Sequence, residues 1–214
     1  MKKNKIHRFN NMASFPKDIK NLIQSISQLP GIGPKTAERF VLFLLKRENF
    51  RKILAKDILN LKNINFCENC GNFTKDKICN ICADPKRNKN KIIVLAQPQE
   101  INVFENIHDY NGLYHVLGGL INSTKDIKDK DLDINGLIKK IKKNNKKTEI
   151  IFALNSTSKG EGTMLYIKNL ILKNKNLKNK VKLSRIARGI PTGGEISYAD
   201  DLTLRESLTN RRSI

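Results

Sequence analysis

The sequence predicts an α+β protein with more than one domain, and three observations carry that prediction. Apolar residues recur at helical spacing over the first third of the chain, and all four cysteines are confined to one short segment. In the remainder, short β-branched runs alternate with helical segments, which favours a parallel sheet with crossover helices. A chain of 214 residues is long enough for one medium domain or two small ones.

The first part of the chain is expected to form a helical domain over residues 15–63, after a polar N-terminal tail over residues 1–14. Apolar side chains recur there at the spacing of amphipathic helices. Glycine and proline dominate Leu29–Pro34, which predicts a tight turn between the first two helices. The predicted helices cover Phe15–Gln28, Lys35–Lys46 and Arg51–Lys62.

An α/β domain over residues 91–186 is expected after a charged linker at Pro85–Asn90. The predicted strands cover Lys91–Ala96, Tyr114–Leu117, Thr148–Leu154 and Val181–Ser184. The predicted helices cover Gln99–His108, Leu132–Lys143 and Met164–Leu172. In the C-terminal segment, 187–214, a loop at Gly189–Gly194 breaks the alternation before a helix predicted at Asp200–Thr209.

The charge balance favours a polyanionic partner over the role of a metabolic enzyme working alone. The chain has 41 Lys and Arg against 20 Asp and Glu, a formal net charge of +21, which is typical of nucleic-acid-binding proteins. Lys outnumbers Arg 31 to 10, a bias that an A/T-rich coding sequence also produces, so the motifs must decide. The Lys- and Asn-rich stretches at Lys139–Lys147 and Lys173–Lys182 are expected to be solvated helix ends and loops.

The sequence predicts neither a membrane span nor a secretory signal. The longest clean apolar run, Phe40–Leu45, is far shorter than the roughly 18–20 residues of a membrane span. The basic start has no apolar stretch behind it. All four cysteines lie between Cys67 and Cys82, and a cytoplasmic chain keeps such thiols reduced or metal-bound. We therefore expect a cytoplasmic protein.

Two Cys-x-x-Cys pairs predict a structural zinc site in a finger domain at residues 64–84. Eight residues separate the pair Cys67 and Cys70 from the pair Cys79 and Cys82. Four thiolates can surround one Zn²⁺ tetrahedrally, and four protein ligands leave no open position for substrate. The alternative is four ordinary thiols. Because so short a segment cannot bury a core, metal binding would supply its folding energy.

The turn between the first two helices predicts a phosphate-binding site. Gly31 and Gly33 permit a tight turn whose amides face outward at the start of the next helix, where the helix dipole favours an anion. Lys35 and Arg39 lie one turn apart on that helix and can flank one backbone phosphate, a contact independent of base sequence. The spacing resembles a helix-hairpin-helix DNA-binding motif; the alternative is a plain pair of packed helices. A nucleotide P-loop is excluded because its G-x-x-x-x-G-K-[ST] spacing is missing.

The α/β region lacks the acidic pattern of a metal-dependent phosphoryl-transfer enzyme. In enzymes of this layout, a strand-end glutamate and an acidic pair on a later strand hold Mg²⁺. Here the first strand ends in Ala96 and the later one is followed by Lys159, so Glu161 alone cannot hold a catalytic metal. Further acids lie around the C-terminal loop and helix. Acids at the start of a helix complement its dipole, and this explains them at least as well as metal binding does. These acids are Glu195, Asp200 and Asp201.

Taken in order, the hairpin, the cysteine pairs and the α/β region resemble the RecR family of bacterial recombination mediators. The resemblance covers nearly all of the chain, from about Phe15 to Arg212. The segments that carry it are Leu29–Arg39, Cys67–Cys82, Tyr114–Gly119, Gly160–Thr163, Ala187–Glu195 and Tyr198–Leu204.

This resemblance implies a helix-hairpin-helix domain, a four-cysteine zinc finger, a Toprim domain and a C-terminal segment similar to a Walker B strand, assembled into a homotetrameric ring that can encircle DNA. It also implies a DNA-binding mediator of DNA repair that is not an enzyme and acts with RecO and, in many bacteria, RecF. Such proteins help to load RecA onto single-stranded DNA coated by single-strand-binding protein, at gaps and breaks, which implies a nucleoid-associated location. The residues that the resemblance marks are Lys35 and Arg39 for DNA and Cys67, Cys70, Cys79 and Cys82 for one zinc ion.

The chain departs from the family at two positions, and two other functions stay open. Family members usually have a glutamate where this chain has Ala96, and another where it has Lys159. These losses fit a protein that is not an enzyme, and they alter any RecO-contacting surface that uses those acids. One alternative is a Mg²⁺-dependent Toprim enzyme of nuclease, primase or topoisomerase type, which an intact acidic cluster would mark. The other is a zinc-ribbon RNA-binding protein, which explains the charge but not the hairpin and the C-terminal loop together.

Overall fold

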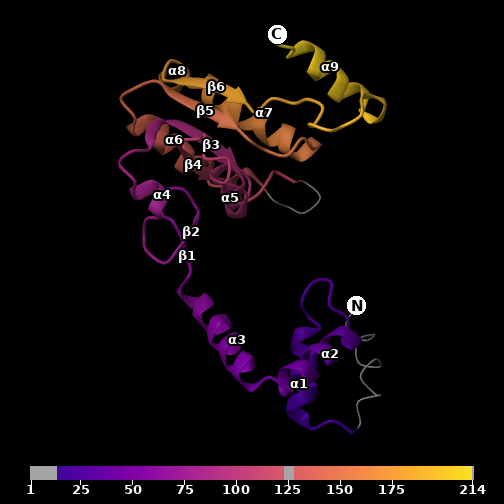
Figure 1. Cartoon of the computed structure of the whole chain (residues 1–214). Coiled ribbons are helices and arrows are strands. Elements are labelled where there is room, and N and C mark those ends of the chain that lie inside the picture. The colour runs from indigo at the N-terminus through magenta and orange to yellow at the C-terminus, as the bar shows by residue number, and fades with distance from the viewer. Residues whose placement is uncertain (1–13, 123–127, 214) are drawn as a thin grey trace. The chain divides into compact units, whose positions relative to one another are not determined.

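The computed structural model describes residues 14–122 and 128–213, and the chain divides into two compact units between Asn63 and Ile64. Figure 1 labels the helices and strands. The polar tail expected at 1–14 lies outside the described residues except for its final residue. No helix in the described ranges is long and apolar enough to cross a membrane.

The first unit is helical over its described residues, as the periodicity predicts. Its helices are α1 (Lys17–Ile26), α2 (Pro34–Leu45) and α3 (Glu48–Asn60), and α3 runs into a 3₁₀ turn at Leu61–Asn63. α1 and α2 pack through Ile23, Ala37 and Val41, which are spaced so that each helix turns one apolar stripe inward. α3 begins three residues earlier than predicted; Glu48 in its first turn complements the helix dipole.

The second unit begins with the finger. It is made of the strands β1 (Asn65–Phe66) and β2 (Phe73–Thr74) and the short helix α4 (Asn80–Ala83). The two strands pair antiparallel, with Asn65 opposite Thr74. Elements this short enclose no apolar core of their own, and the residues buried in the finger are cysteines.

A four-stranded parallel sheet forms the centre of the second unit, with strand order β4-β3-β5-β6. Its strands are β3 (Asn88–Leu95), β4 (Gly112–Val116), β5 (Thr148–Phe152) and β6 (Val181–Arg185). Ile92 of β3 lies opposite Leu113 of β4 on one side and Ile150 of β5 on the other. The parallel sheet expected from the alternating pattern is therefore confirmed.

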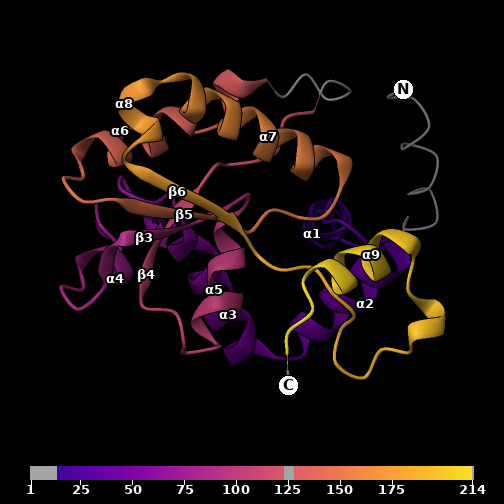
Figure 2. The same ribbon diagram turned by 90° about the horizontal axis from the view of Figure 1, so that it is seen from above.

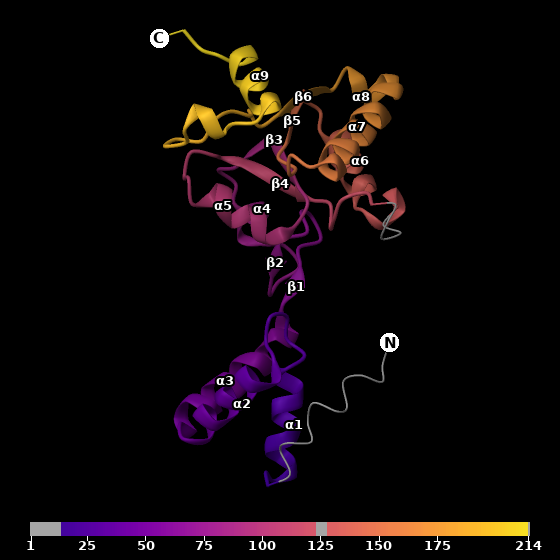
Figure 3. The ribbon, with the colours of Figure 1, turned by 90° about the vertical axis from the view of Figure 1, so that its right-hand side faces the viewer.

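Helices cover both faces of this sheet. The helices of the second unit after α4 are α5 (Ile101–Glu105), α6 (Ile134–Lys143), α7 (Ser158–Lys173), α8 (Lys175–Lys178) and α9 (Asp201–Thr209). Short 3₁₀ turns lie at Pro98–Glu100, Asp129–Asp131 and Ile196–Tyr198. Figures 2 and 3 show α6, α7 and α8 on one face of the sheet and α5 on the other. The larger core lies under α6, α7 and α8.

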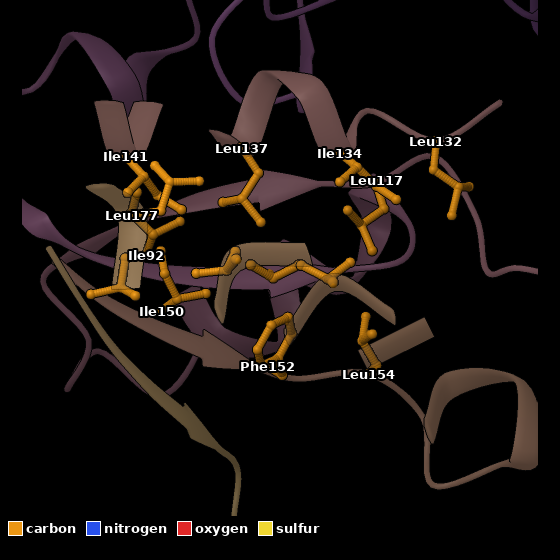
Figure 4. Close-up of a cluster of buried hydrophobic side chains, with 14 of the residues drawn as sticks. Ile92, Leu117, Leu132, Ile134, Leu137, Ile141, Ile150, Phe152, Leu154 and Leu177 are labelled. Carbon is orange, nitrogen blue, oxygen red and sulfur yellow. The ribbon is translucent and has the colours of Figure 1, made fainter. Parts of the chain in front are cut away.

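The two-residue period of the strands divides the core between the faces. Ile92 and Val94 point into the larger core, whereas Ile93 and Leu95 point into the smaller core with Tyr114. Figure 4 shows side chains of the larger core from the sheet and from the helices above it. A sheet buried on both faces explains why its strands are continuous apolar runs in the sequence.

Three elements of this unit begin earlier than the sequence predicts: β3, β4 and α7. β3 begins at Asn88, so the last part of the expected linker belongs to the sheet; Asn88 N donates to Asn111 O at 2.7 Å. α7 begins at Ser158 because Thr157 caps it, its hydroxyl accepting from Gly160 N at 3.2 Å. A Cβ on Gly160 would lie 2.0 Å from the carbonyl oxygen of Asn155, so this first turn requires glycine.

The C-terminal segment contains a helix but no strand over its described residues, 187–213. The helix α9 lies where the sequence predicts one, and Asp200 caps it by accepting from Thr203 N at 2.9 Å. Arg185 at the end of β6 donates to Glu206 of α9 at 2.7 Å, which ties the helix to the sheet. The described residues of this segment therefore do not form the strand that a likeness to Walker B implies.

Candidate metal centre and candidate nucleic-acid interface

The four cysteines converge in the finger. Their Sγ atoms all lie within 4.8 Å of one another, and those of Cys70 and Cys79 are 3.6 Å apart. A tetrahedral centre with Zn–S bonds of about 2.3 Å has S···S edges of about 3.8 Å. Cys67, Cys70 and Cys79 are buried and Cys82 is partly exposed. The cluster therefore has the size, chemistry and shielding of a structural zinc site.

Backbone hydrogen bonds shape the loop around the sulfurs. Cys67 N donates to Asn72 O at 2.7 Å, and Gly71 N donates back to Cys67 O at 2.9 Å. Gly71 adopts φ +77°, which glycine tolerates best, and a Cβ there would lie 3.1 Å from Cβ of Val116. Cys79 N points at Cys67 Sγ at 3.3 Å, a contact that stabilises a thiolate. The loop is thus held both to itself and to β4.

The thiols also polarise one another. Hydrogen bonding with Cys70 is the main cause that lowers the pKa of Cys82 to about 6, and the same interaction, with burial, raises the pKa of Cys70. Zn²⁺ takes the place of the thiol protons, so its binding releases protons and weakens at acid pH. The residues fit the metal. When bound, it supplies a cross-link and no reaction, because four protein ligands fill its coordination sphere.

Two polar side chains that the sequence does not single out lie behind the finger. Lys140 of α6 donates from Nζ to Nδ1 of His115 at 3.0 Å and to the carbonyl oxygen of Tyr114 at 3.4 Å. His115 is fully buried, and its Nε2 donates to the carbonyl oxygen of Asp133 at 2.6 Å. Burial and the Lys140 ammonium lower the pKa of His115 to about 4, so the imidazole is neutral. Lys140 is therefore an exception to the expectation that its lysine-rich stretch is solvated.

The hairpin turn has the backbone geometry that its glycines predict. Gly31 adopts φ +78°, and Gly33 is the extended N-cap of α2, with Pro34 at the first helical position. Ala37 N donates to Gly33 O at 2.9 Å, which is the first hydrogen bond of the helix. No side chain caps this N-terminus in the described residues, so its first amides are available to an anion.

Lys35 and Arg39 are both exposed on the first turns of α2. Side chains four residues apart lie on the same face of a helix, so the two cations flank the N-terminus of α2 on one side. Buried Ala37 and Val41 hold the opposite face against α1. The fold thus presents the two cations together, and their contact with DNA stays a prediction.

Two of the acids that the sequence singles out, Glu161 and Asp200, are engaged in structural roles. Glu161 pairs with Arg188 and, at 3.6 Å, with Arg185, and Asp200 caps α9. Ala96 is buried at the end of β3 and Lys159 is exposed at the start of α7. The four cysteines are the only group of three or more potential metal ligands within the described ranges. These residues do not form the acidic cluster of a metal-dependent enzyme.

Comparison with known families finds consecutive matches along the chain. The RecR helix-hairpin-helix family matches residues 19–59 and the RecR four-cysteine zinc finger domain matches residues 64–84. The Toprim domain matches residues 90–187 and the RecR C-terminal family matches residues 189–212. Fold and cysteine cluster together define a protein that joins a helix-hairpin-helix domain, a four-cysteine zinc finger and a Toprim domain.

Curated relatives match over most of their length. "Recombination protein RecR" of Phytoplasma mali is 40% identical over 201 residues, which cover 91% of this chain and 94% of the relative. The protein of the same name from Flavobacterium johnsoniae is 41% identical, over 90% of this chain and 92% of the relative. The one from Lactobacillus helveticus is 36% identical, over 94% of this chain and 99% of the relative. The chain belongs to the RecR family of recombination proteins.

Proposed function

We propose that this chain is a DNA-binding recombination mediator that acts in DNA repair with RecO and, where present, RecF. It helps to load RecA on single-stranded DNA covered by single-strand-binding protein, at gaps and breaks, and works in the cytoplasm at the nucleoid. The observation that carries the proposal is the exposed hairpin of α1 and α2 in a chain of the RecR family. The uncapped N-terminus of α2 and the net charge of +21 support binding to phosphate.

The proposal assigns roles to individual residues. Lys35 and Arg39 contact the DNA backbone, so binding is independent of base sequence and extends to single-stranded, gapped and duplex DNA. The proposed zinc ligands are Cys67, Cys70, Cys79 and Cys82. The proposed domains cover 15–63, 64–84, 91–186 and 187–214, and the division of the chain after Asn63 supports the first boundary.

Absence of catalysis is part of the proposal. A Toprim enzyme needs clustered carboxylates to hold Mg²⁺ at the ends of its strands. Here Glu161 is neutralised by Arg185 and Arg188. The carboxylate of Glu100 is also occupied, since it accepts from Ala96 N and Gln97 N at 2.9 Å each. Neither group is poised to bind a catalytic cation.

A homotetrameric ring completes the proposal. α3 buries no residue in the described chain, although it carries apolar side chains. Among these, Ile53 and Ile58 are 57% and 58% exposed. Apolar side chains gathered on an exposed helix favour contact with another protein surface, and a second copy is the partner that a ring requires. Light scattering should give about four times the chain mass for the unaltered protein and a smaller mass for Ile53→Asp/Ile58→Asp. Lys56→Asp on the same helix is the control, and a monomeric unaltered protein would contradict the ring.

Gel electrophoresis tests the proposed function directly. The full-length protein is incubated with supercoiled, gapped and single-stranded DNA in Mg²⁺, and each sample is run both natively and after deproteinisation. We expect retarded native complexes and chemically unchanged DNA after deproteinisation. DNA that is nicked, relaxed, cleaved or extended, by an activity that follows the protein through purification, would refute the mediator. It would point to metal binding at Glu161, Glu195, Asp200 and Asp201.

A further inference from the structure

The finger docks on one edge of the sheet, the strand β4. β4 is an edge strand, since it pairs with β3 on one side only, and an open edge exposes unpaired backbone groups. Val116 N donates to the carbonyl oxygen of Cys70 at 2.8 Å, so the loop between the first two cysteines takes up one of these groups. Ile81, which precedes Cys82, packs against the smaller core of the sheet. The cysteine cluster is therefore seated on β4.

Lys140 reaches the same edge from the other side of the sheet. Its Nζ lies 3.4 Å from the carbonyl oxygen of Tyr114, two residues before the amide that binds Cys70. Nδ1 of the neutral His115 accepts from the same ammonium at 3.0 Å. A lysine ammonium has three N–H donors, and these two acceptors fix its position. Lys140 is thus a partly buried cation held on the same strand edge to which Cys70 is hydrogen-bonded.

The charge of a zinc-loaded finger explains why a cation is placed there. Zn²⁺ with four thiolates leaves the centre with excess negative charge, and burying such a charge is unfavourable unless a positive group offsets it. Burial lowers the pKa of Lys140, and the nearby charges of Cys70 and Cys82 partly oppose that effect. The lysines of the finger hairpin, Lys75 and Lys77, are exposed, so water screens them more strongly.

We propose that Lys140 is a positioning residue for the metal centre: held on the edge of β4 by Tyr114 and His115, its ammonium offsets the charge of the zinc-bound cysteines and keeps the metal in the finger. This inference rests on the proposed zinc ligands. It couples the Toprim sheet to the finger, because Lys140 belongs to α6 whereas the four ligands belong to the finger, which precedes β3. A variant that loses only the charge should therefore weaken the hold on zinc while the sheet stays folded.

The test compares Lys140→Met with Lys139→Met in the full-length, zinc-loaded protein. Lys139 is exposed on the same helix. Both variants lose one positive charge, but only Lys140→Met loses the charge on the edge of β4. Competition with a chromophoric chelator measures zinc affinity, and circular dichroism verifies the fold. We expect Lys140→Met to bind zinc about 10- to 100-fold more weakly than Lys139→Met, as is typical when an outer-sphere partner is removed. Equal zinc affinity in the two variants would overturn the proposal.

A second variant separates charge from packing. Lys140→Arg keeps the positive charge on a different stem, so it should hold zinc more tightly than Lys140→Met. If Lys140→Met does not fold, Lys140→Gln, which is polar but uncharged, is compared with Lys140→Arg, and weaker zinc binding by Lys140→Gln is expected. A folded Lys140→Arg that loses zinc as readily as Lys140→Met would show that charge is not what matters. Failure of all variants and the unaltered protein to bind zinc would refute the ligand set itself.

Discussion

Replacing Cys67 by serine is expected to abolish stoichiometric zinc binding and to unfold the finger. Two strands of two residues and a helix of four cannot supply a core, so the metal is the main source of stability there. Structural zinc binding is worth about 10–16 kcal/mol in small finger peptides, more than the total stability of most domains. Elemental analysis of the purified variant measures the metal, and thermal unfolding measures the stability.

The effect should stay within the second unit. Loss of the finger removes the hydrogen bond from Val116 N to Cys70 O, so the Val116 amide should exchange its hydrogen faster with solvent. The amide of Val41 in α2 belongs to the other compact unit, so its hydrogen should exchange at the rate of the unaltered protein. Asp76→Ser, an exposed change in the same finger, is the matched control. A Cys67→Ser protein with full zinc content and unchanged melting would disprove the four-cysteine site.

The zinc cluster and the hairpin were predictable because their determinants are local. Two Cys-x-x-Cys turns bring sulfurs together wherever the loop between them closes, and the Gly31-Ile32-Gly33-Pro34 run defines a turn before any tertiary contact forms. The alternating pattern of strands and helices likewise predicted the parallel sheet. Each of these predictions depends on residues close together in the sequence.

The features that sequence reasoning missed depend on distant residues or on weak local signals. Nothing local distinguishes Lys140 from Lys139, because only the approach of β4 gives Lys140 its two acceptors. The first five residues of α7 include Gly160 and Gly162, which disfavour a helix and conceal its start. The Thr157 cap was the available signal, and Gly160 is explained only by the carbonyl oxygen of Asn155 packed against it.

The double substitution Lys35→Ala/Arg39→Ala is expected to weaken DNA binding about 10- to 100-fold near physiological salt while the fold survives. Both side chains are exposed, and neither contributes to the core between α1 and α2. If each neutralises one phosphate, the log–log dependence of affinity on salt becomes less steep by about 1.8 on duplex DNA and about 1.4 on single strands for each hairpin engaged. Fluorescence anisotropy titrations at several salt concentrations measure both quantities.

A matched pair of lysines decides between a specific interface and general basicity. Lys139 and Lys143 are also exposed and four residues apart on one helix, α6, so Lys139→Ala/Lys143→Ala removes the same charge. If the net charge of +21 alone attracted DNA, the two double variants would lose affinity equally. A hairpin interface requires the loss to be confined to Lys35 and Arg39 and to be the same on unrelated DNA sequences, because phosphate contacts carry no base information. Unchanged affinity and salt slope in Lys35→Ala/Arg39→Ala would exclude the hairpin as the DNA-binding surface.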